Sequence, residues 1–61
     1  MITLTSKLKD FSTRKIFVNP SQIFFMCAGP RGTEVTFNGG LTTLIEETPE
    51  TIISLIKGVT L

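Results

Sequence analysis

The segment around Arg31, which reads Gly-Pro-Arg-Gly-Thr over residues 29–33, has residue types that can hold a phosphate group. A guanidinium donates paired hydrogen bonds to phosphate oxygens, and a glycine-rich turn can aim backbone N–H groups at an anion. Arg31, Gly32 and Thr33 are therefore candidate ligand-binding residues. The segment lacks the Gly-Lys-Ser/Thr ending of a P-loop and joins two expected strands, so it does not indicate a nucleoside triphosphatase. The alternative is an ordinary hairpin turn with an exposed arginine.

A second group of cations lies near the N-terminus, where Lys7, Lys9, Arg14 and Lys15 follow one another closely. Arg14 and Lys15 join the candidates for binding a phosphate-bearing ligand, such as a nucleotide or cyclic nucleotide, in an oligomer that pairs these loops. The alternative is a solvated loop whose charges point into water. The net charge is only +1, without the basic stripe of a dedicated nucleic-acid binder, so weak nucleic-acid binding ranks third.

The sequence offers no evident set of residues for catalysis or for a metal. It has no histidine and a single cysteine, Cys27, so the usual nucleophile–base pairs and zinc ligand sets are missing. Cys27 has apolar neighbours and is expected to be a small buried core residue rather than a nucleophile. Glu46 and Glu47 are adjacent, and on a strand they would point to opposite faces. We expect a non-enzymatic protein without a cofactor.

The length of the chain bears on how it is stabilised. A domain of 61 residues buries only about 60% of its unfolded surface, and neither a disulfide nor zinc is expected to add to this. We therefore expect a homo-oligomer. The composition, with 41% hydrophobic and 18% charged residues, is that of a folded protein. A lone cysteine, no signal-peptide pattern and no apolar run of about 20 residues predict a cytoplasmic protein that does not insert into membranes.

Short alternating or β-branched runs, separated by turn residues, predict five strands. The predicted ranges are 2–5, 15–18, 21–28, 33–37 and 41–45. Asn19-Pro20 breaks the chain, residues 6–13 are expected to be a loop or wide hairpin, and Gly39-Gly40 suits a turn that needs positive φ. The run 21–28 is apolar on both faces, which predicts a strand in the middle of the sheet with cover on each side.

The residues after position 47 predict the one helix. Thr48 is a suitable N-cap, Pro49 suits the first helical position, and Glu50 places negative charge at the positive end of the helix dipole. Gly58 is expected to end the helix in a left-handed conformation, leaving a short tail. One apolar stripe is formed by Ile52, Leu55, Ile56 and Val59.

Strands followed by one helix predict an α+β fold over residues 1–61, a small antiparallel β-meander or partial barrel of about five strands with one C-terminal helix. A single helix covers only one face of such a sheet. The other face, with Phe17, Phe24 and Met26, is expected to form the homo-oligomer contact. The alternative is a sheet that curls onto itself as a small barrel and covers both faces.

Three motifs occur in a characteristic order. The chain begins Met-Ile-Thr-Leu-Thr, continues with Phe-Val-Asn-Pro-Ser-Gln-Ile at 17–23, and reads Glu-Thr-Pro-Glu-Thr-Ile-Ile at 47–53. In this order the sequence resembles the small bacterial flagellar proteins of the FlbD/SwrD type. It departs from them at residues 6–13, where the family has a tight Asn-Gly turn. Similar small proteins are carried by phages and mobile elements.

The resemblance implies a role in flagellar motility and no enzymatic activity. We expect a small protein-interaction or regulatory module that self-associates. The alternative is a phage or mobile-element protein whose oligomer binds or sequesters a small phosphate-bearing ligand.

Overall fold

The computed structural model of the protein describes residues 1–60, with side chains described as far as residue 58. Its elements are β1 (Ile2–Lys7), β2 (Thr13–Val18), the 3-10 turn η1 (Pro20–Gln22), β3 (Ile23–Gly29), β4 (Gly32–Phe37), β5 (Thr42–Ile45) and α1 (Pro49–Thr60). The five strands form one antiparallel sheet in the order β2-β1-β5-β4-β3, with the helix at the C-terminal end. This confirms the predicted α+β fold class.

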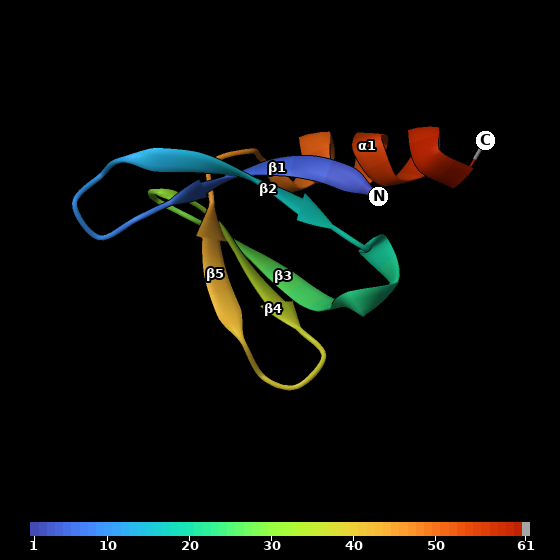
Figure 1. Ribbon diagram of the computed structural model, residues 1–61, viewed down its shortest axis with the longest axis horizontal. Coiled ribbons are helices and arrows are strands. Elements are labelled where there is room, and N and C mark those ends of the chain that lie inside the picture. The colour runs from blue at the N-terminus through green and yellow to red at the C-terminus, as the bar shows by residue number, and fades with distance from the viewer. Residues whose placement is uncertain (61) are drawn as a thin grey trace.

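The sheet is open, with β2 and β3 as its two edges. Figure 1 shows the β1–β2 hairpin lying across the part formed by β3, β4 and β5, with α1 alongside β1. The structure measures 36 × 21 × 19 Å and exposes 4260 Å². A compact protein of 6.7 kDa is expected to expose about 3,900 Å², so this chain leaves more surface in contact with solvent than its mass requires.

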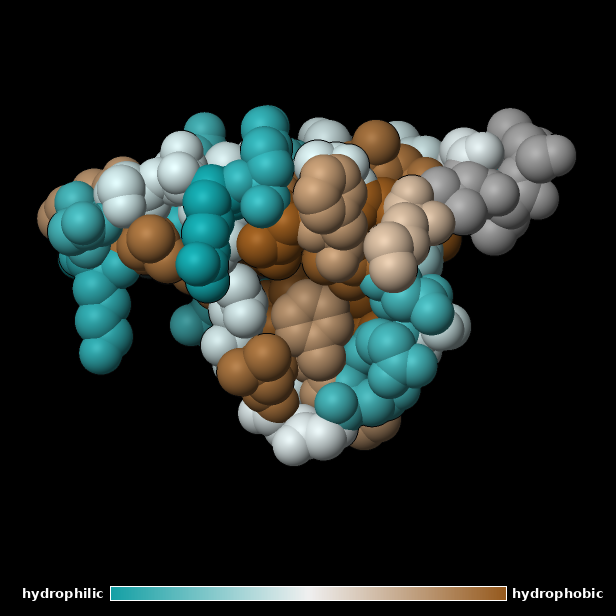
Figure 2. All heavy atoms as spheres, in the orientation of Figure 1, coloured by the Kyte–Doolittle hydropathy of each residue, from teal (hydrophilic) through white to brown (hydrophobic). Residues whose placement is uncertain are grey.

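The core lies between α1 and the inner face of the sheet. Its fully or nearly buried apolar residues, among those described, are Ile2, Leu4, Val18, Val35, Ile45 and Ile52. Further apolar residues pack against this cluster but stay partly exposed, namely Ile16, Ile23, Met26, Phe37 and Ile56. Figure 2 shows apolar side chains at the centre of one face, where the β1–β2 hairpin meets the β3–β5 part. One helix therefore covers the inner face incompletely.

The start of α1 is formed as its sequence predicts, but its end is not. The Thr51 N–H donates to Thr48 Oγ1 at 3.2 Å, and the Ile52 N–H donates to the Thr48 carbonyl at 3.0 Å, so Thr48 is the N-cap. The helix continues through Gly58 to Thr60, so the prediction that Gly58 ends it is wrong. The predicted tail at Leu61 lies outside the described residues.

The prediction that the apolar run 21–28 lies in the middle of the sheet is also wrong, because β3 is an edge strand. A register shift between Ile23 and Phe25 explains its two apolar faces. Ile23 pairs with Phe37 and Met26 pairs with Val35, so both point toward the core, while Phe25 pairs with Thr36 on the outer face. One extra residue at Phe24 changes the alternation of the strand.

The same register corrects the prediction for Cys27. It pairs with Glu34 on the outer face of the sheet and its side chain is exposed, so it is not a core residue. The glycines of the β4–β5 loop behave as predicted, with φ of 99° at Gly39 and 93° at Gly40. The long segment before β2 is a hairpin loop, in which the Leu8 N–H donates to the Ser12 carbonyl at 2.8 Å.

Candidate functional site

The outer part of β3 carries the largest aromatic surface that the fold leaves uncovered. Phe24 is 70% exposed and Phe25 is 50% exposed. Their rings meet edge to face, with centroids 5.5 Å apart. Both line a shallow hollow of about 280 Å³, which continues along Thr36, Phe37, Asn38, Gly39 and Gly40. Exposed aromatic side chains beside a hollow are typical of surfaces that bind another macromolecule.

The two edge strands of the sheet differ in how they are protected from pairing. β2 carries Arg14 and Lys15, and charged side chains on an edge discourage another strand from adding to it. β3 spans seven residues, Ile-Phe-Phe-Met-Cys-Ala-Gly, without a charge or a proline. Its free edge is therefore the place where a further strand would add to this sheet.

The three residues predicted to form one interface do not share one face. Met26 points toward the core and is half-buried, because it pairs with Val35. Phe24 is exposed on β3, whereas Phe17 is 72% exposed on β2, the other edge strand, where it pairs with Thr3. Phe25 belongs to the apolar surface instead, and sequence reasoning missed it because the register shift cannot be recognised in the sequence.

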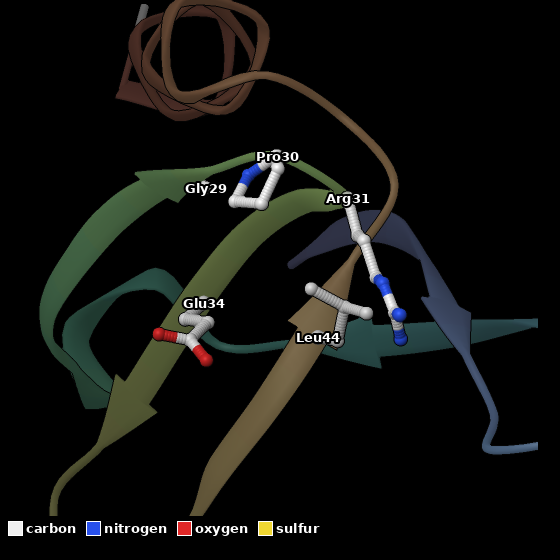
Figure 3. A pocket seen from close by; sticks show the side chains of 5 residues that line it. All are labelled: Gly29, Pro30, Arg31, Glu34 and Leu44. Atoms are coloured by element: carbon white, nitrogen blue, oxygen red, sulfur yellow. The ribbon is translucent and has the colours of Figure 1, made fainter.

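Arg31 lies in the two-residue turn between β3 and β4. Its side chain runs past Leu44 and away from Glu34, so that Leu44 lies between the two charged groups (Figure 3). These residues line a hollow of about 290 Å³ together with Gly29 and Pro30. The guanidinium carbon of Arg31 lies 5.8 Å from the centre of the Phe11 ring in the β1–β2 loop.

The other predicted ligand residues are not gathered around Arg31. Thr33 is fully buried and its hydroxyl donates to the Glu47 carbonyl at 2.6 Å. Lys15 lies on β2, where its ammonium donates to Thr5 Oγ1 at 3.0 Å. Gly32 has φ of 143° and packs against the backbone of Ile45, so its role is structural.

Arg14 is exposed and pairs with Ser6, on the opposite face of the β1–β2 hairpin from Lys7. The residues that do surround Arg31 are Lys7 and Lys9 from the basic cluster and the aromatic Phe11. The spacing of the cations indicated the cluster, but nothing in the sequence indicated that Phe11 would lie beside Arg31.

Glu47 joins the sheet to the beginning of the helix. The backbone N–H of Thr5 donates to its Oε1 and the Thr5 hydroxyl donates to its Oε2, both at 2.8 Å. Partial burial raises the pKa of this carboxyl, but the two hydrogen bonds from Thr5 and the charge of Lys15 outweigh it and hold the pKa below its ordinary value. The carboxylate is therefore satisfied by a structural role and is not a free acid or base.

Comparison with known proteins gives no relative from which a role can be transferred. No family model, curated protein or solved structure matches the chain. The resemblance to the flagellar FlbD/SwrD-type proteins therefore stays a prediction. Within residues 1–60, no helix has the length and apolar character needed to cross a membrane.

Proposed function

We propose that the protein is a small, non-enzymatic interaction module that works as a self-associated assembly, in which the free edge of β3 pairs with β3 of a second copy. The observation that carries this proposal is the uncharged β3 edge with Phe24 and Phe25 exposed beside it. Antiparallel pairing of two β3 strands satisfies the backbone groups of both edges and lets the two aromatic clusters cover one another.

A second copy is the occupant that the surface favours. The same strand on both partners makes a two-fold interface in which each edge supplies the donors and acceptors that the other lacks. Neither strand brings a charge into the contact. The small core supports the same conclusion, since a domain of this size gains much of its missing burial from a partner.

A stable dimer requires an interface of ordinary size. A standard interface buries about 800 Å² on each partner, which is about a fifth of the 4260 Å² that this chain exposes. A fully buried phenylalanine covers about 150–250 Å², and Phe24 and Phe25 still expose 70% and 50% of their surface, so together they would supply roughly a quarter to a third of it. The lone cysteine favours a reducing cytoplasm as the compartment, and the sequence resemblance favours flagellar motility as the process.

The test is sedimentation of the wild-type protein and two matched variants at tens of micromolar. Phe25→Lys adds a charge beside the β3 edge, and Phe17→Lys adds the same charge beside β2, at a phenylalanine that is also exposed. We expect the wild type and Phe17→Lys to sediment as oligomers and Phe25→Lys as a monomer, each with the far-ultraviolet circular dichroism of the folded chain. A wild-type monomer, or an oligomer lost only in Phe17→Lys, would overturn the proposal.

A further inference from the structure

The β1–β2 loop and the β3–β4 turn enclose a small cationic hollow that the self-association proposed above does not use. Its volume is about 190 Å³, and it is lined by Lys7, Leu8, Lys9, Phe11, Arg31 and Leu44. Three of these residues are cations and none is a carboxylate. The hollow beside Glu34 adjoins it, because Arg31 and Leu44 line both.

Arg31 lines the hollow beside an aromatic ring and an ammonium group. Its guanidinium lies over the Phe11 ring, and the Lys7 ammonium donates to the Arg31 carbonyl at 3.2 Å. A cation within about 6 Å of a ring centre is attracted to the aromatic face. The guanidinium adds a planar set of N–H donors to the two ammonium groups that line the hollow.

Phe11 occupies the left-handed position of the β1–β2 hairpin loop, where its N–H donates to the Leu8 carbonyl at 3.0 Å and glycine is the usual residue. Its φ is 68°, in the left-handed region that bulky residues rarely occupy, and its side chain is 69% exposed. Strained backbone in folded proteins is concentrated at binding and catalytic sites. An aromatic ring held out into solvent by such a backbone gives no packing to the core, but it offers an apolar face at the mouth of the hollow.

We propose that this hollow binds an organic phosphate monoester, with the phosphate held by Lys7, Lys9 and Arg31 and the organic part lying against Phe11 and Leu8. A phosphate monoester carries about −1.5 to −2 charges at pH 7, which matches three cations better than the single charge of a carboxylate does. Its three terminal oxygens also accept the paired donors of a guanidinium.

Glu34 sets the direction in which the ligand can extend. It lines the adjoining hollow on the far side of Leu44, so a second phosphate placed there would meet a carboxylate. A nucleic-acid strand carries a phosphate at every nucleotide and is disfavoured by this arrangement. A ligand with one phosphate and a planar ring, as in a nucleoside monophosphate, needs only the cations and the apolar residues of the first hollow.

The test is a titration of the isotopically labelled protein with adenosine monophosphate as the probe, followed through the amide signals of residues 7–12 and 31. Inorganic phosphate and adenosine are titrated separately. We expect the monophosphate to bind at least about tenfold more tightly than either part alone. Phe11→Leu should weaken binding of the monophosphate and leave inorganic phosphate unchanged.

The charge variants separate a built site from general attraction to a cationic protein. Lys9→Gln and Arg31→Gln should each weaken the binding of the monophosphate about tenfold, since each removes charge-assisted hydrogen bonds. Arg31→Lys keeps the charge but loses the paired donors of the guanidinium. Its affinity for the monophosphate should therefore lie between those of Arg31→Gln and the wild type. Arg14→Gln is the matched control, because it removes the same charge from a residue that does not line the hollow.

Three outcomes would overturn the proposal. An equal loss in Arg14→Gln would show attraction to net charge alone. If inorganic phosphate bound as tightly as the monophosphate, the organic part of the ligand would gain nothing from contact with Phe11. Tighter binding of an oligothymidylate than of the monophosphate, with steep salt dependence, would point to a nucleic-acid strand instead. Sedimentation of each variant separates loss of phosphate binding from loss of self-association. None of these substitutions lies on the β3 edge, so the oligomer should be unchanged in all of them.

Discussion

Thr5 and Glu47 are 42 residues apart in the chain and are joined by two hydrogen bonds of 2.8 Å. The backbone between them is tied as well, because the Glu46 N–H donates to the Thr5 carbonyl at 2.8 Å. On the other side, the Lys15 ammonium donates to the Thr5 hydroxyl. Thr5 therefore links the β2 edge of the sheet, through its own strand, to the residue that precedes the helix N-cap.

Replacing Glu47 tests this link directly. Glu47→Gln keeps one oxygen acceptor but removes the charge and the second acceptor, so the free energy of unfolding should fall by about 1 kcal/mol. Glu46→Gln makes the same chemical change at an exposed neighbour and should alter it by less than about 0.5 kcal/mol. Urea denaturation of both variants at neutral pH measures the difference, and equal effects would show that the carboxylate of Glu47 is not stabilising.

The pKa of Glu47 predicts how stability depends on pH. Because its pKa is lowered in the folded protein, the unfolded chain binds a proton at higher pH than the folded one. The stabilisation that ionised Glu47 gives to the folded state is complete above 4.5, the ordinary pKa of a glutamate. It is lost as the pH falls below 4.5 and through the lowered pKa of the folded state. Denaturation curves between neutral pH and pH 3 should show this acid-side loss, and it should be smaller in Glu47→Gln.

Gly32 lies so close to the backbone of β5 that adding a methyl group there should lower the stability of the fold more than adding one at Gly39. A Cβ at Gly32 would lie inside van der Waals contact with the carbonyl oxygen of Ile45, and φ is 143° there. Gly32→Ala should cost about 3 kcal/mol. Gly39→Ala is the control, since φ is 99° but the space around it is open, and strain alone should cost about 1–2 kcal/mol. Similar losses of unfolding free energy in the two variants would mean that β5 can move away from the added methyl group at little cost.

The N-cap of the helix predicts a smaller and more local effect. Thr48→Ala removes the acceptor for the Thr51 N–H and should lower the free energy of unfolding by about 1 kcal/mol. Ser54→Ala lies on the exposed side of the same helix and should be neutral or slightly stabilising, because alanine is the better helix former. Thermal unfolding followed by circular dichroism compares them, and a neutral Thr48→Ala would show that the cap is not needed.

The parts of the fold that the sequence predicts are those set by neighbouring residues. Thr48 and Pro49 mark the start of the helix, and Gly39-Gly40 mark a hairpin, because a cap and a positive φ are local requirements. The position of β3 at the edge is not local. It depends on β5 returning to pair with β1, where Ser6 lies opposite Ile45.

The candidate site was less predictable than the fold for the same reason. The register shift beside Phe24 turns Phe25 outward and Met26 inward, and a two-sided apolar run gives no sign of it. Arg31 was recognised by its turn, but its nearest aromatic partner is Phe11, which belongs to another hairpin. The three cations can be read from the sequence, but only the pairing of the strands shows that they line one hollow with Phe11.

The strained backbone of Phe11 provides a test of whether this residue serves the fold. Asparagine tolerates the left-handed region, so Phe11→Asn relieves strain of about 1 kcal/mol while it loses a cation–π contact worth about 0.5–1 kcal/mol at an exposed site. The free energy of unfolding should therefore change by less than about 0.5 kcal/mol. Phe37→Asn removes a phenylalanine that packs against the core and should cost about 3 kcal/mol or more.

This comparison separates two reasons for a phenylalanine at position 11. If the ring stabilised the hairpin, its loss would resemble that of Phe37, and the hollow beside Arg31 would be a by-product of packing. If stability is unchanged while adenosine monophosphate binds more weakly, the ring contributes nothing to the folded state that could offset its strain. That result would assign the exposed ring and its contact with Arg31 to ligand binding rather than to the stability of the hairpin.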